Sequence, residues 1–433
     1  MLISFTVSNY RSFRDTMELS MEATGISEYK ECLLHYKKKP LLPVVAVFGK
    51  NGGGKTNLIR AFWLGVQFIK NAQKTQYEGA PIPVRPFMLN DYSSEKPTSF
   101  EYAYIYESVK YVYGFSATKN QIVEEHLYHW PKGKKAVVFE RDHQMFNFPK
   151  DQERKKKELI RSTVDTNQLF FSISCVMNYK PCIQAMKWFR QMILFSNDYN
   201  DIPGQIIEHR EDKNALKAIV QAAKVADVGI CDMEFTFSDK KIQVNEQLPD
   251  NMPDGIRTAI TEFMAALGNT TNDAEGMLMV SNVQATSYHK GINKEGGIST
   301  YPLSLADESD GTRQLMAIAP AIESVLHSGG LLIVDELGKD MNPVLMEYVV
   351  SLFQRKKRNP NNAQIIFTTH NTELLNMELL RRDQIYFVDK NRKNGVSDLY
   401  CLNDFSPSLS ENIKKEYLLG KFGAIPNVDI GEV

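Results

Sequence analysis

The distribution of apolar and polar positions predicts buried strands that alternate with helices. An apolar run at 43–48 predicts a buried strand, and residues 57–63, which follow a glycine-rich segment, have the pattern of a helix start. Two further apolar runs, at 331–334 and 363–368, have the length of buried strands and end in polar residues. We therefore predict an α/β fold with a mixed or parallel sheet as its core.

Other segments predict antiparallel strands and a helical insertion. Alternating residues at 2–7 and 17–21 predict two strands, and short tyrosine-rich runs between 100 and 139 predict an antiparallel β-meander. Residues 150–228 are predicted to be helical, because 183–194 and 213–225 carry apolar residues at helical spacing. The remaining predicted elements are strands at 232–244, 384–388 and 399–402, two strands within 277–301, and helices at 253–267, 344–355 and 410–418.

Composition and charge limit the class of protein and its partners. The chain has 433 residues, of which 43% are hydrophobic and 24% charged, which is typical of a globular protein with two or three domains. Its net charge of −1 means that any contact with DNA must come from local basic patches. The candidates are the runs Lys132–Lys135, Arg154–Lys157 and Arg355–Arg358, for which solvated helix ends and loops are the alternative.

The cysteines and the N-terminus predict a cytoplasmic protein. Five scattered cysteines show no metal-binding spacing and fit a reducing cytosol. The first residues alternate like a strand and have no basic segment or cleavage site, so they do not predict a signal peptide. No apolar run approaches the ~20 residues of a membrane span, so we expect no membrane partner.

The glycine-rich loop between the first buried strand and its helix predicts a phosphate-binding site. It has the P-loop pattern in the strand–loop–helix context that this motif requires, although a chance glycine-rich turn is the alternative. Glycines let backbone N–H groups close around the phosphates, and the helix N-terminus adds its positive dipole end. Lys55 is placed to bridge the β- and γ-phosphates and Thr56 to ligate Mg²⁺. The predicted nucleotide-binding residues here are Gly49, Asn51, Gly52, Gly53, Gly54, Lys55, Thr56 and Asn57.

Polar residues at two later strand ends predict the chemistry of phosphate hydrolysis. Asp335 would hold Mg²⁺ through water, and Glu336 would polarise the attacking water as general base. His370, after the next strand, could hydrogen-bond the γ-phosphate. Two acidic residues at a strand end can arise by chance, and a single strand-end histidine usually has no function. Here they follow a P-loop and lie at the carboxyl edge where such sheets bind ligands.

Two further segments offer candidate nucleotide contacts. Glu308–Gln314 opens a helix, and Ser309 with Gly311 could form an anion site at its N-terminus, for which an ordinary capped helix is the alternative. Arg11 follows the first strand and could reach the nucleotide or simply be a solvated turn arginine.

Together these motifs resemble the ABC-type ATPase heads of the SMC/RecF/OLD group. The matching segments, in that family's order, are Asn9–Phe13, the P-loop with Asn51, Ser309–Thr312 as signature, Leu331–Glu336 as Walker B, and Thr369–His370 as switch histidine. More narrowly, the chain resembles the compact AAA_15/AAA_21 ATPases of bacterial phage-defence and abortive-infection loci, of the RloA and AbiL type and related to PtuA and AriA. This likeness is carried by Glu308–Arg313, Arg381–Ile385 and Gly420–Pro426.

The resemblance implies ATP and Mg²⁺ as cofactors and a dimer or higher oligomer of heads. Each ATP would lie between Lys55 of one chain and Ser309 of the other. The implied lobes are a nucleotide-binding lobe at 1–150, a helical insertion at 151–229 in place of long SMC arms, and a signature, Walker B and switch-histidine lobe at 230–433.

The chain departs from the family pattern at three places. Asp310 and Thr312 stand where the wider family has glycine and glutamine or glutamate, a variant that is expected in the narrower group. The turn Gly338–Pro343 lacks the small residues and the histidine that relatives usually have before the proline, which puts the usual dimer contacts of this turn in doubt. No Q-loop glutamine is identified, and the candidate region is 85–90.

The implied function is that of an ATP-hydrolysing sensor or regulator in phage defence, working with a separately encoded effector for which a nuclease is the leading candidate. The alternative is a RecF-like ATPase of DNA repair or chromosome maintenance. A transporter subunit is disfavoured by Asn9–Phe13 and by the long stretch between Thr56 and Ser309. The chain itself offers no set of carboxylate or histidine ligands for metal-dependent DNA cleavage outside the ATP motifs.

Overall fold

The chain forms two compact units in a computed structural model that describes residues 1–37, 39–71, 77, 79–149, 153–196, 202–243, 277–408 and 411–425. The first unit contains Met1–Asn197 and Ala321–Val433, and the second contains Asp198–Pro320. Their boundary at Pro320 lies inside α9 (Asp310–Ser328). The three lobes predicted at 1–150, 151–229 and 230–433 have different boundaries, and that division stays a prediction.

A six-stranded sheet forms the centre of the first unit. In spatial order its strands are β11 (Met192–Ser196), β15 (Leu331–Asp335), β16 (Gln364–Thr368), β5 (Val44–Phe48), β17 (Ile385–Lys390) and β18 (Ser397–Cys401). All neighbours are parallel except β18, which pairs antiparallel with β17. The predicted mixed, mainly parallel core is therefore confirmed. The carboxyl ends of β5, β15 and β16 share one edge of the sheet, where polar groups can meet.

The outer strand β11 corrects the sequence prediction. The segment 183–194 was expected to be helical throughout. It is helical only as far as Arg190, where α5 (Lys180–Arg190) ends, and Met192–Ser196 pairs in parallel with Leu331–Asp335. A short apolar run fits either a helix or a buried strand, and here an open sheet edge decides in favour of the strand. The preceding helices of the insertion are α3 (Arg154–Arg161) and α4 (Phe170–Val176).

A second, antiparallel sheet confirms the predicted meander. Its strands in spatial order are β10 (Met145–Asn147), β9 (Ala136–Asp142), β8 (Ile122–His129), β7 (Val109–Ala117), β6 (Thr98–Tyr106), β1 (Leu2–Ser8) and β2 (Met17–Ser20). The tyrosines of this meander are largely buried: Tyr102, Tyr104 and Tyr113 are fully enclosed. They therefore belong to the core of this sheet.

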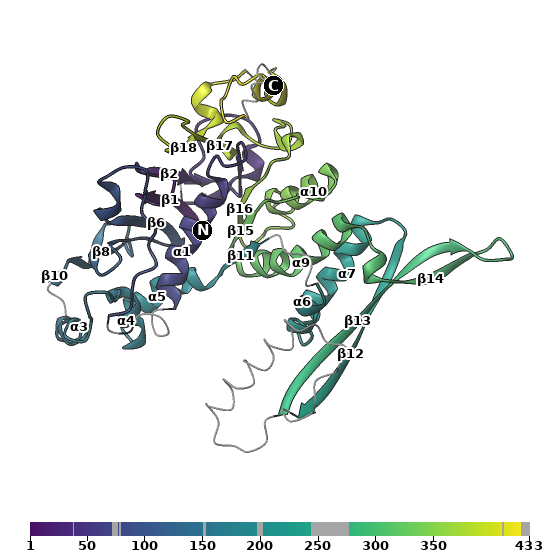
Figure 1. Cartoon of the computed structure of the whole chain (residues 1–433), viewed down its shortest axis with the longest axis horizontal. Helices are drawn as coiled ribbons and strands as arrows, with labels where there is room; N and C mark the ends of the chain where they lie inside the picture. Colours follow the sequence, from purple (N-terminus) through teal and green to yellow (C-terminus); the bar gives the residue numbers. More distant parts are fainter. Residues whose placement is uncertain are drawn as a thin grey trace. The chain divides into compact units, whose positions relative to one another are not determined.

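Helix α1 (Lys55–Lys70) packs between the two sheets (Figure 1). Its Phe62 ring lies 4.7 Å from the ring of Phe5 and 5.2 Å from that of Tyr102 in the antiparallel sheet. On its other side, Leu58 and Ile59 face β15 and β16. Burial of apolar surface on both faces fixes the helix that carries the P-loop at its N-terminus.

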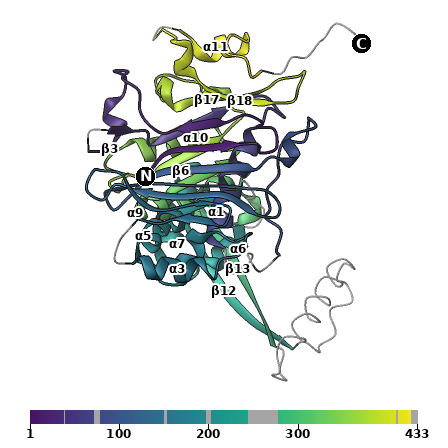
Figure 2. The ribbon, with the colours of Figure 1, turned by 90° about the vertical axis from the view of Figure 1, so that its left-hand side faces the viewer.

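The C-terminal segment covers the edge of the parallel sheet. Figure 2 shows α11 (Ile413–Leu418) beside β17 and β18. The ring of Phe387 stacks on Tyr417 at 5.3 Å and on Phe422 at 5.8 Å. This unit also contains β3 (Leu34–Tyr36), β4 (Lys39–Leu41) and α10 (Pro343–Gln354). No helix among the described residues is long and apolar enough to cross a membrane.

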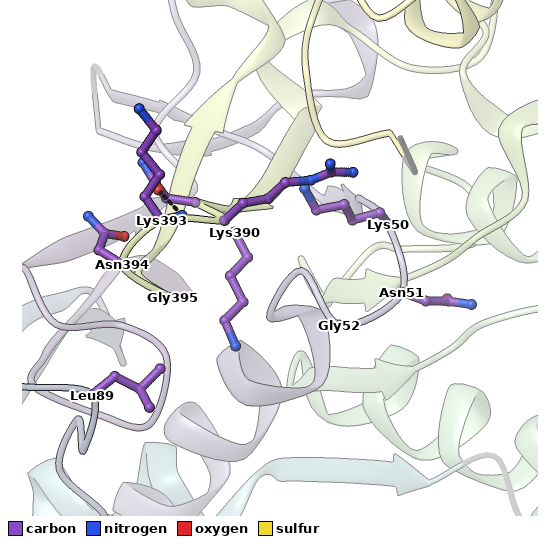
Figure 3. Close-up of a pocket in the computed structure, with 10 residues that line it drawn as sticks. Lys50, Asn51, Gly52, Leu89, Lys390, Lys393, Asn394 and Gly395 are labelled. Atoms are coloured by element: carbon purple, nitrogen blue, oxygen red, sulfur yellow. Dashed lines mark hydrogen bonds between the residues drawn. The ribbon is translucent and has the colours of Figure 1, made fainter. Parts of the chain in front are cut away.

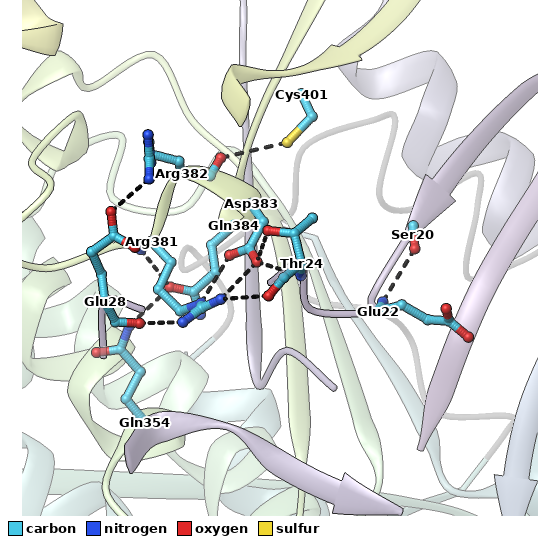
Figure 4. Close-up of polar contacts among 10 residues, drawn as sticks. All are labelled: Ser20, Glu22, Thr24, Glu28, Gln354, Arg381, Arg382, Asp383, Gln384 and Cys401. Carbon is cyan, nitrogen blue, oxygen red and sulfur yellow. Dashed lines mark hydrogen bonds and ion pairs between the residues drawn. The ribbon is translucent and has the colours of Figure 1, made fainter. Parts of the chain in front are cut away.

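The motif at Arg381–Ile385 has a structural role. The buried Arg381 guanidinium pairs with Asp383 at 2.8 Å, and the Asp383 carboxylate accepts hydrogen bonds from the backbone and hydroxyl of Thr24 (Figure 4). Arg382 pairs with Glu28 at 2.7 Å. A buried ion pair is costly unless its remaining hydrogen bonds are satisfied, which Thr24 achieves here. The cluster thereby fastens the segment after β2 to the start of β17.

In its described residues, the second unit contains an antiparallel sheet, two complete helices and the first part of α9. Its strands are β12 (Ile230–Gln243), β13 (Met277–Ile292) and β14 (Ile298–Ser304), in that spatial order, and its helices are α6 (Ile202–Glu208) and α7 (Lys213–Ala226). The helix predicted at 253–267 lies outside the described residues. The short turn after β14 leads into the N-terminus of α9, which carries the predicted signature.

Candidate nucleotide site

Backbone geometry makes the glycine loop after β5 specific for glycine. Gly49, Gly52 and Gly54 have φ angles of 151°, 74° and 124°, in the region that residues with a side chain rarely adopt. A Cβ on Gly49 would lie only 2.3 Å from the carbonyl oxygen of Val388. The loop is therefore pressed against β17 and still presents a turn of backbone at the start of α1.

Residues far away in sequence form hydrogen bonds with the glycine loop and with the first turn of α1. The Ser397 hydroxyl donates to the Gly53 carbonyl at 2.6 Å, and the Ser397 N–H donates to the Ser12 carbonyl at 2.7 Å. The Asn57 amide donates to the Ser12 hydroxyl at 2.9 Å. Sequence reasoning missed Ser397, because a single serine in an edge strand carries no local signal of such a contact.

Lys55 lies where the P-loop prediction places it. Its side chain is buried, and its ammonium donates to the carbonyls of Gly49 at 2.5 Å and Lys50 at 3.1 Å. Burial lowers the pKa of Lys55 to about 8, although the nearby carboxylates of Glu336 and Asp335 oppose this shift. The lysine therefore carries its positive charge at neutral pH but loses it in mildly alkaline solution.

Oxygen atoms from three segments meet beside the start of α1. The Asp335 carboxylate accepts hydrogen bonds from the Thr368 hydroxyl at 2.8 Å and the Thr56 hydroxyl at 3.3 Å. Such carboxylate and hydroxyl oxygens fit Mg²⁺, which is usually bound by one or two protein oxygens together with water and phosphate. Thr368 was not predicted as a site residue, and its contact follows from the parallel pairing of β15 with β16.

Glu336 has a strained backbone next to His370. Its φ angle is 58°, a left-handed conformation that costs a non-glycine residue on the order of 1–3 kcal/mol. Its N–H donates to the Thr368 hydroxyl at 2.8 Å, and its carboxylate lies 3.3 Å from Nε2 of His370. The other ring nitrogen of His370, Nδ1, lies 3.3 Å from the Lys55 ammonium. Burial, followed by the positive charge of Lys55, lowers the pKa of His370, so the ring is neutral at pH 7.

In the turn that contains Arg11, Asn9 has a structural role, whereas no role is established for the Arg11 side chain. The Asn9 amide donates to the carbonyls of Ser93 and Lys96, so Asn9 fastens the loop that precedes β6. Arg11 has a φ angle of 48°, and its N–H donates to the Arg85 carbonyl within the candidate Q-loop region. Its buried Nε atom has no hydrogen-bond partner among the described residues. The predicted contact of Arg11 with the nucleotide stays a prediction.

The predicted signature residues lie in the second unit. Ser309 caps α9: its hydroxyl accepts from the Thr312 N–H at 3.2 Å. Gly311 stands in the first turn of that helix. The preceding Glu308 is buried, accepts a hydrogen bond from the Ser287 hydroxyl, and lies 2.8 Å from Nε2 of His289. The structure thus gathers Lys55, Thr56, Asp335, Glu336 and His370 in the first unit, and gives Ser309 a separate support in the second.

Comparison with protein families shows where this combination belongs. The family model described as "AAA domain, putative AbiEii toxin, Type IV TA system", AAA_21, matches residues 44–376, well over half of the chain. The chain belongs to the AAA_21 family. The match begins at β5 and ends after His370, so it includes the P-loop and both acidic residues of β15 and its turn. The AAA_21 part of the resemblance is confirmed, and this family is one of P-loop ATPases.

The chain also aligns with solved structures at low similarity. One is the "SMC head domain from Thermotoga maritima", with 12% identity, coverage of 92% of this chain and 98% of that chain, and a TM-score of 0.38. Another is the SMC head bound to the C-winged helix domain of ScpA, with 12% identity, coverage of 92% and 97%, and a TM-score of 0.40. At these scores the likeness carries no argument about function. No curated protein matches the chain.

Proposed function

We propose that this chain is an ATP-hydrolysing regulator in bacterial anti-phage defence that acts with a separately encoded effector. The observation that carries ATP hydrolysis is the chain of contacts from Lys55 through His370 to Glu336, beside the Thr56–Asp335 pair. A buried cation, a neutral histidine and a carboxylate around one glycine loop can together bind phosphate and position water for phosphoryl transfer. The family description, with its toxin and Type IV TA system, supports a defence role.

Each residue has a distinct part in the proposed reaction. The loop amides and Lys55 hold the β- and γ-phosphates, and Thr56 and Asp335 would hold Mg²⁺, which when bound offsets the charge of the phosphates. The Glu336 carboxylate orients a water molecule and accepts its proton as the water oxygen bonds to the γ-phosphorus and the bond to the β-phosphate oxygen breaks. His370, neutral and between Lys55 and Glu336, hydrogen-bonds the γ-phosphate.

We further propose that each site is completed by a second copy of the chain. Ser309 starts a long helix, and the N-terminus of a helix favours a negatively charged group. In the proposed homodimer this helix start meets the γ-phosphate held by the partner's P-loop. The narrower likeness to the RloA and AbiL type and a cytoplasmic location belong to the same proposal.

Substitution of Lys55 and Glu336 tests the proposed ATPase. Lys55→Ala should lose nucleotide binding, because the charge on the phosphates is gone. Glu336→Gln should bind ATP normally but hydrolyse it ~10²–10⁴-fold more slowly, because the general base is lost. Fluorescent-nucleotide binding and phosphate release measure the two effects, and wild-type hydrolysis by the Glu336→Gln protein would contradict the general-base assignment.

Nuclease assays on the pure chain, and identification of the proteins that co-purify with it, test the effector proposal. It should cleave neither plasmid DNA nor tRNA with Mg²⁺ and ATP, and a nuclease should co-purify with it from its host. Cleavage that remains after further purification would contradict a separate effector. Co-purification with replication or repair proteins instead would favour the RecF-like alternative.

A further inference from the structure

A basic cavity lies next to the glycine loop. It has a volume of about 770 Å³ and is lined by Lys50–Gly52 of the P-loop, Leu89, and residues 390–395 at the end of β17 and in the turn that leads to β18. Figure 3 shows these residues around one opening, with Lys390 and Lys393 extending from the turn in different directions. The proposed hydrolysis uses none of the side chains of this turn.

The charges around the cavity are not balanced. Lys50 forms an ion pair with Asp389 at 2.6 Å, so its charge is largely neutralised. The turn adds Lys390, Arg392 and Lys393. Among the described residues, neither Lys390 nor Lys393 forms an ion pair with a carboxylate. In a chain with a net charge of −1, this local excess of positive charge is a property of the site and not of the whole protein.

The turn is preorganised. The Asn391 side chain accepts from the Lys393 N–H at 2.9 Å, and the Asn394 side chain accepts from the Val396 N–H at 3.0 Å. A Cβ on Gly395, whose φ angle is 68°, would lie 2.4 Å from Leu89, so the turn packs closely on the neighbouring loop. The cations therefore start from a fixed backbone, which lowers the entropy cost of binding.

The same turn is connected to the P-loop. Ser397, the first residue of β18, donates to the Gly53 carbonyl at 2.6 Å. A ligand that shifts the turn would therefore act on the loop that holds ATP. By contrast, the basic run at 154–157 is partly used in packing, because the Lys157 side chain is buried and donates to the Pro149 carbonyl.

We propose that Lys390, Arg392 and Lys393 form a second phosphate-binding site, which takes the phosphate groups of a ligand other than the hydrolysed ATP. The phosphates can come from a nucleic-acid strand or from a free polyphosphate, since both present closely spaced negative oxygens. Binding itself does not depend on the proposed function, but its effect on hydrolysis does.

Charge reversal tests the site directly. A fluorescently labelled single-stranded DNA of about 20 nucleotides, long enough to span one such groove, is titrated in an anisotropy measurement. Lys390→Glu/Arg392→Glu/Lys393→Glu is compared with a charge-matched control at three exposed lysines of the second unit that lie outside the basic runs, Lys213→Glu/Lys217→Glu/Lys294→Glu. The Lys390 triple variant should weaken binding at least ~10-fold and reduce its salt dependence, whereas the control should stay within about twofold of the wild type. Inorganic tripolyphosphate serves as a second probe and as a competitor. Binding of tripolyphosphate alone would identify the ligand as a free polyphosphate, and tight binding of the DNA would identify it as a nucleic-acid strand.

Further arms distinguish this site from the ATP site. Binding of both probes should persist in Lys55→Ala, whose P-loop is defective. Loss of binding in Lys55→Ala would overturn the proposal. So would a Lys390 triple variant that binds both probes as the wild type does, or whose only change is a raised KM for ATP. If the triple variant does not fold, Lys390→Gln/Lys393→Gln should weaken binding severalfold, and unchanged binding there would equally overturn it. Failure of the ATPase proposal would show separately, as absence of hydrolysis by the wild type.

Discussion

The P-loop and the signature turn, the two elements proposed to bind phosphate, are built in opposite ways. The P-loop has three glycines with positive φ angles, packs closely on Val388, and is held by hydrogen bonds of Ser12 and Ser397 from distant parts of the chain. In the signature turn Ser309 caps its own helix, and the buried Glu308 connects the turn to the neighbouring strand β13. The comparison teaches that the groups proposed for hydrolysis lie in the first unit, whereas the proposed contribution of the signature turn is the start of a helix.

The rigid packing of the P-loop can be broken at Gly49. Gly49→Ala would place a Cβ 2.3 Å from the Val388 carbonyl, so the loop must move away from β17. We expect loss of measurable nucleotide binding and destabilisation of at least ~2 kcal/mol. Gly25→Ala is the matched control, because nothing lies within 4 Å of its Cβ. Tight binding of a fluorescent ATP analogue by Gly49→Ala would show that the loop is not held as described.

The support of the signature turn can be weakened at Glu308. Glu308→Ala removes the carboxylate that the Ser287 hydroxyl and the His289 ring contact, and leaves the Ser287 hydroxyl a longer contact of 3.4 Å with the Leu303 carbonyl, so the start of α9 should become less well positioned. We expect kcat to fall ~10-fold at an unchanged affinity for nucleotide, and Glu308→Gln, which keeps an acceptor, to recover much of the rate. An equal loss of nucleotide affinity would contradict the separation of the two elements.

The lowered pKa of the buried Lys55 predicts two modest and opposite effects of a rise in pH: a lower affinity for ATP and a larger contribution of this residue to the stability of the fold. The pKa of Lys55 in the folded protein is about 8, below its ordinary value of 10.5. ATP affinity should therefore fall severalfold as pH rises through 8, because the neutral amine no longer attracts phosphate. Between pH 8 and 10.5 the unfolded chain binds more protons at this residue than the folded one, so its contribution to stability rises with pH. Lys55→Met should lack both trends in binding titrations and thermal melts.

The sequence predicted those site residues that follow directly from a strand end. Local pattern and sheet topology together place these residues at one edge of the parallel sheet, because each lies at or after the carboxyl end of a buried strand. They are Lys55, Thr56, Asp335, Glu336 and His370. Thr368 was not predicted, because its role depends on the register between β15 and β16.

Long-range packing accounts for the larger omissions. The basic cavity joins the P-loop to a turn more than three hundred residues later, and runs of adjacent lysines gave no hint of it. The strand β11 was missed for a related reason: its apolar residues become a strand only because an edge of β15 is available. Tertiary contacts determine both the basic cavity and the strand β11, and a short stretch of sequence does not contain the residues that make these contacts.

The central claim, that each ATP site is shared between two chains, is tested most directly by mixing two inactive variants. Lys55→Ala removes the P-loop contribution, and Ser309→Arg blocks the signature contribution. If sites are shared, mixed dimers hold one intact site, and an equal mixture should recover about a quarter of the wild-type hydrolysis rate, since half of randomly assorted symmetric dimers are mixed. No recovered hydrolysis, with mixed dimers confirmed by light scattering and tag capture, would contradict the shared site.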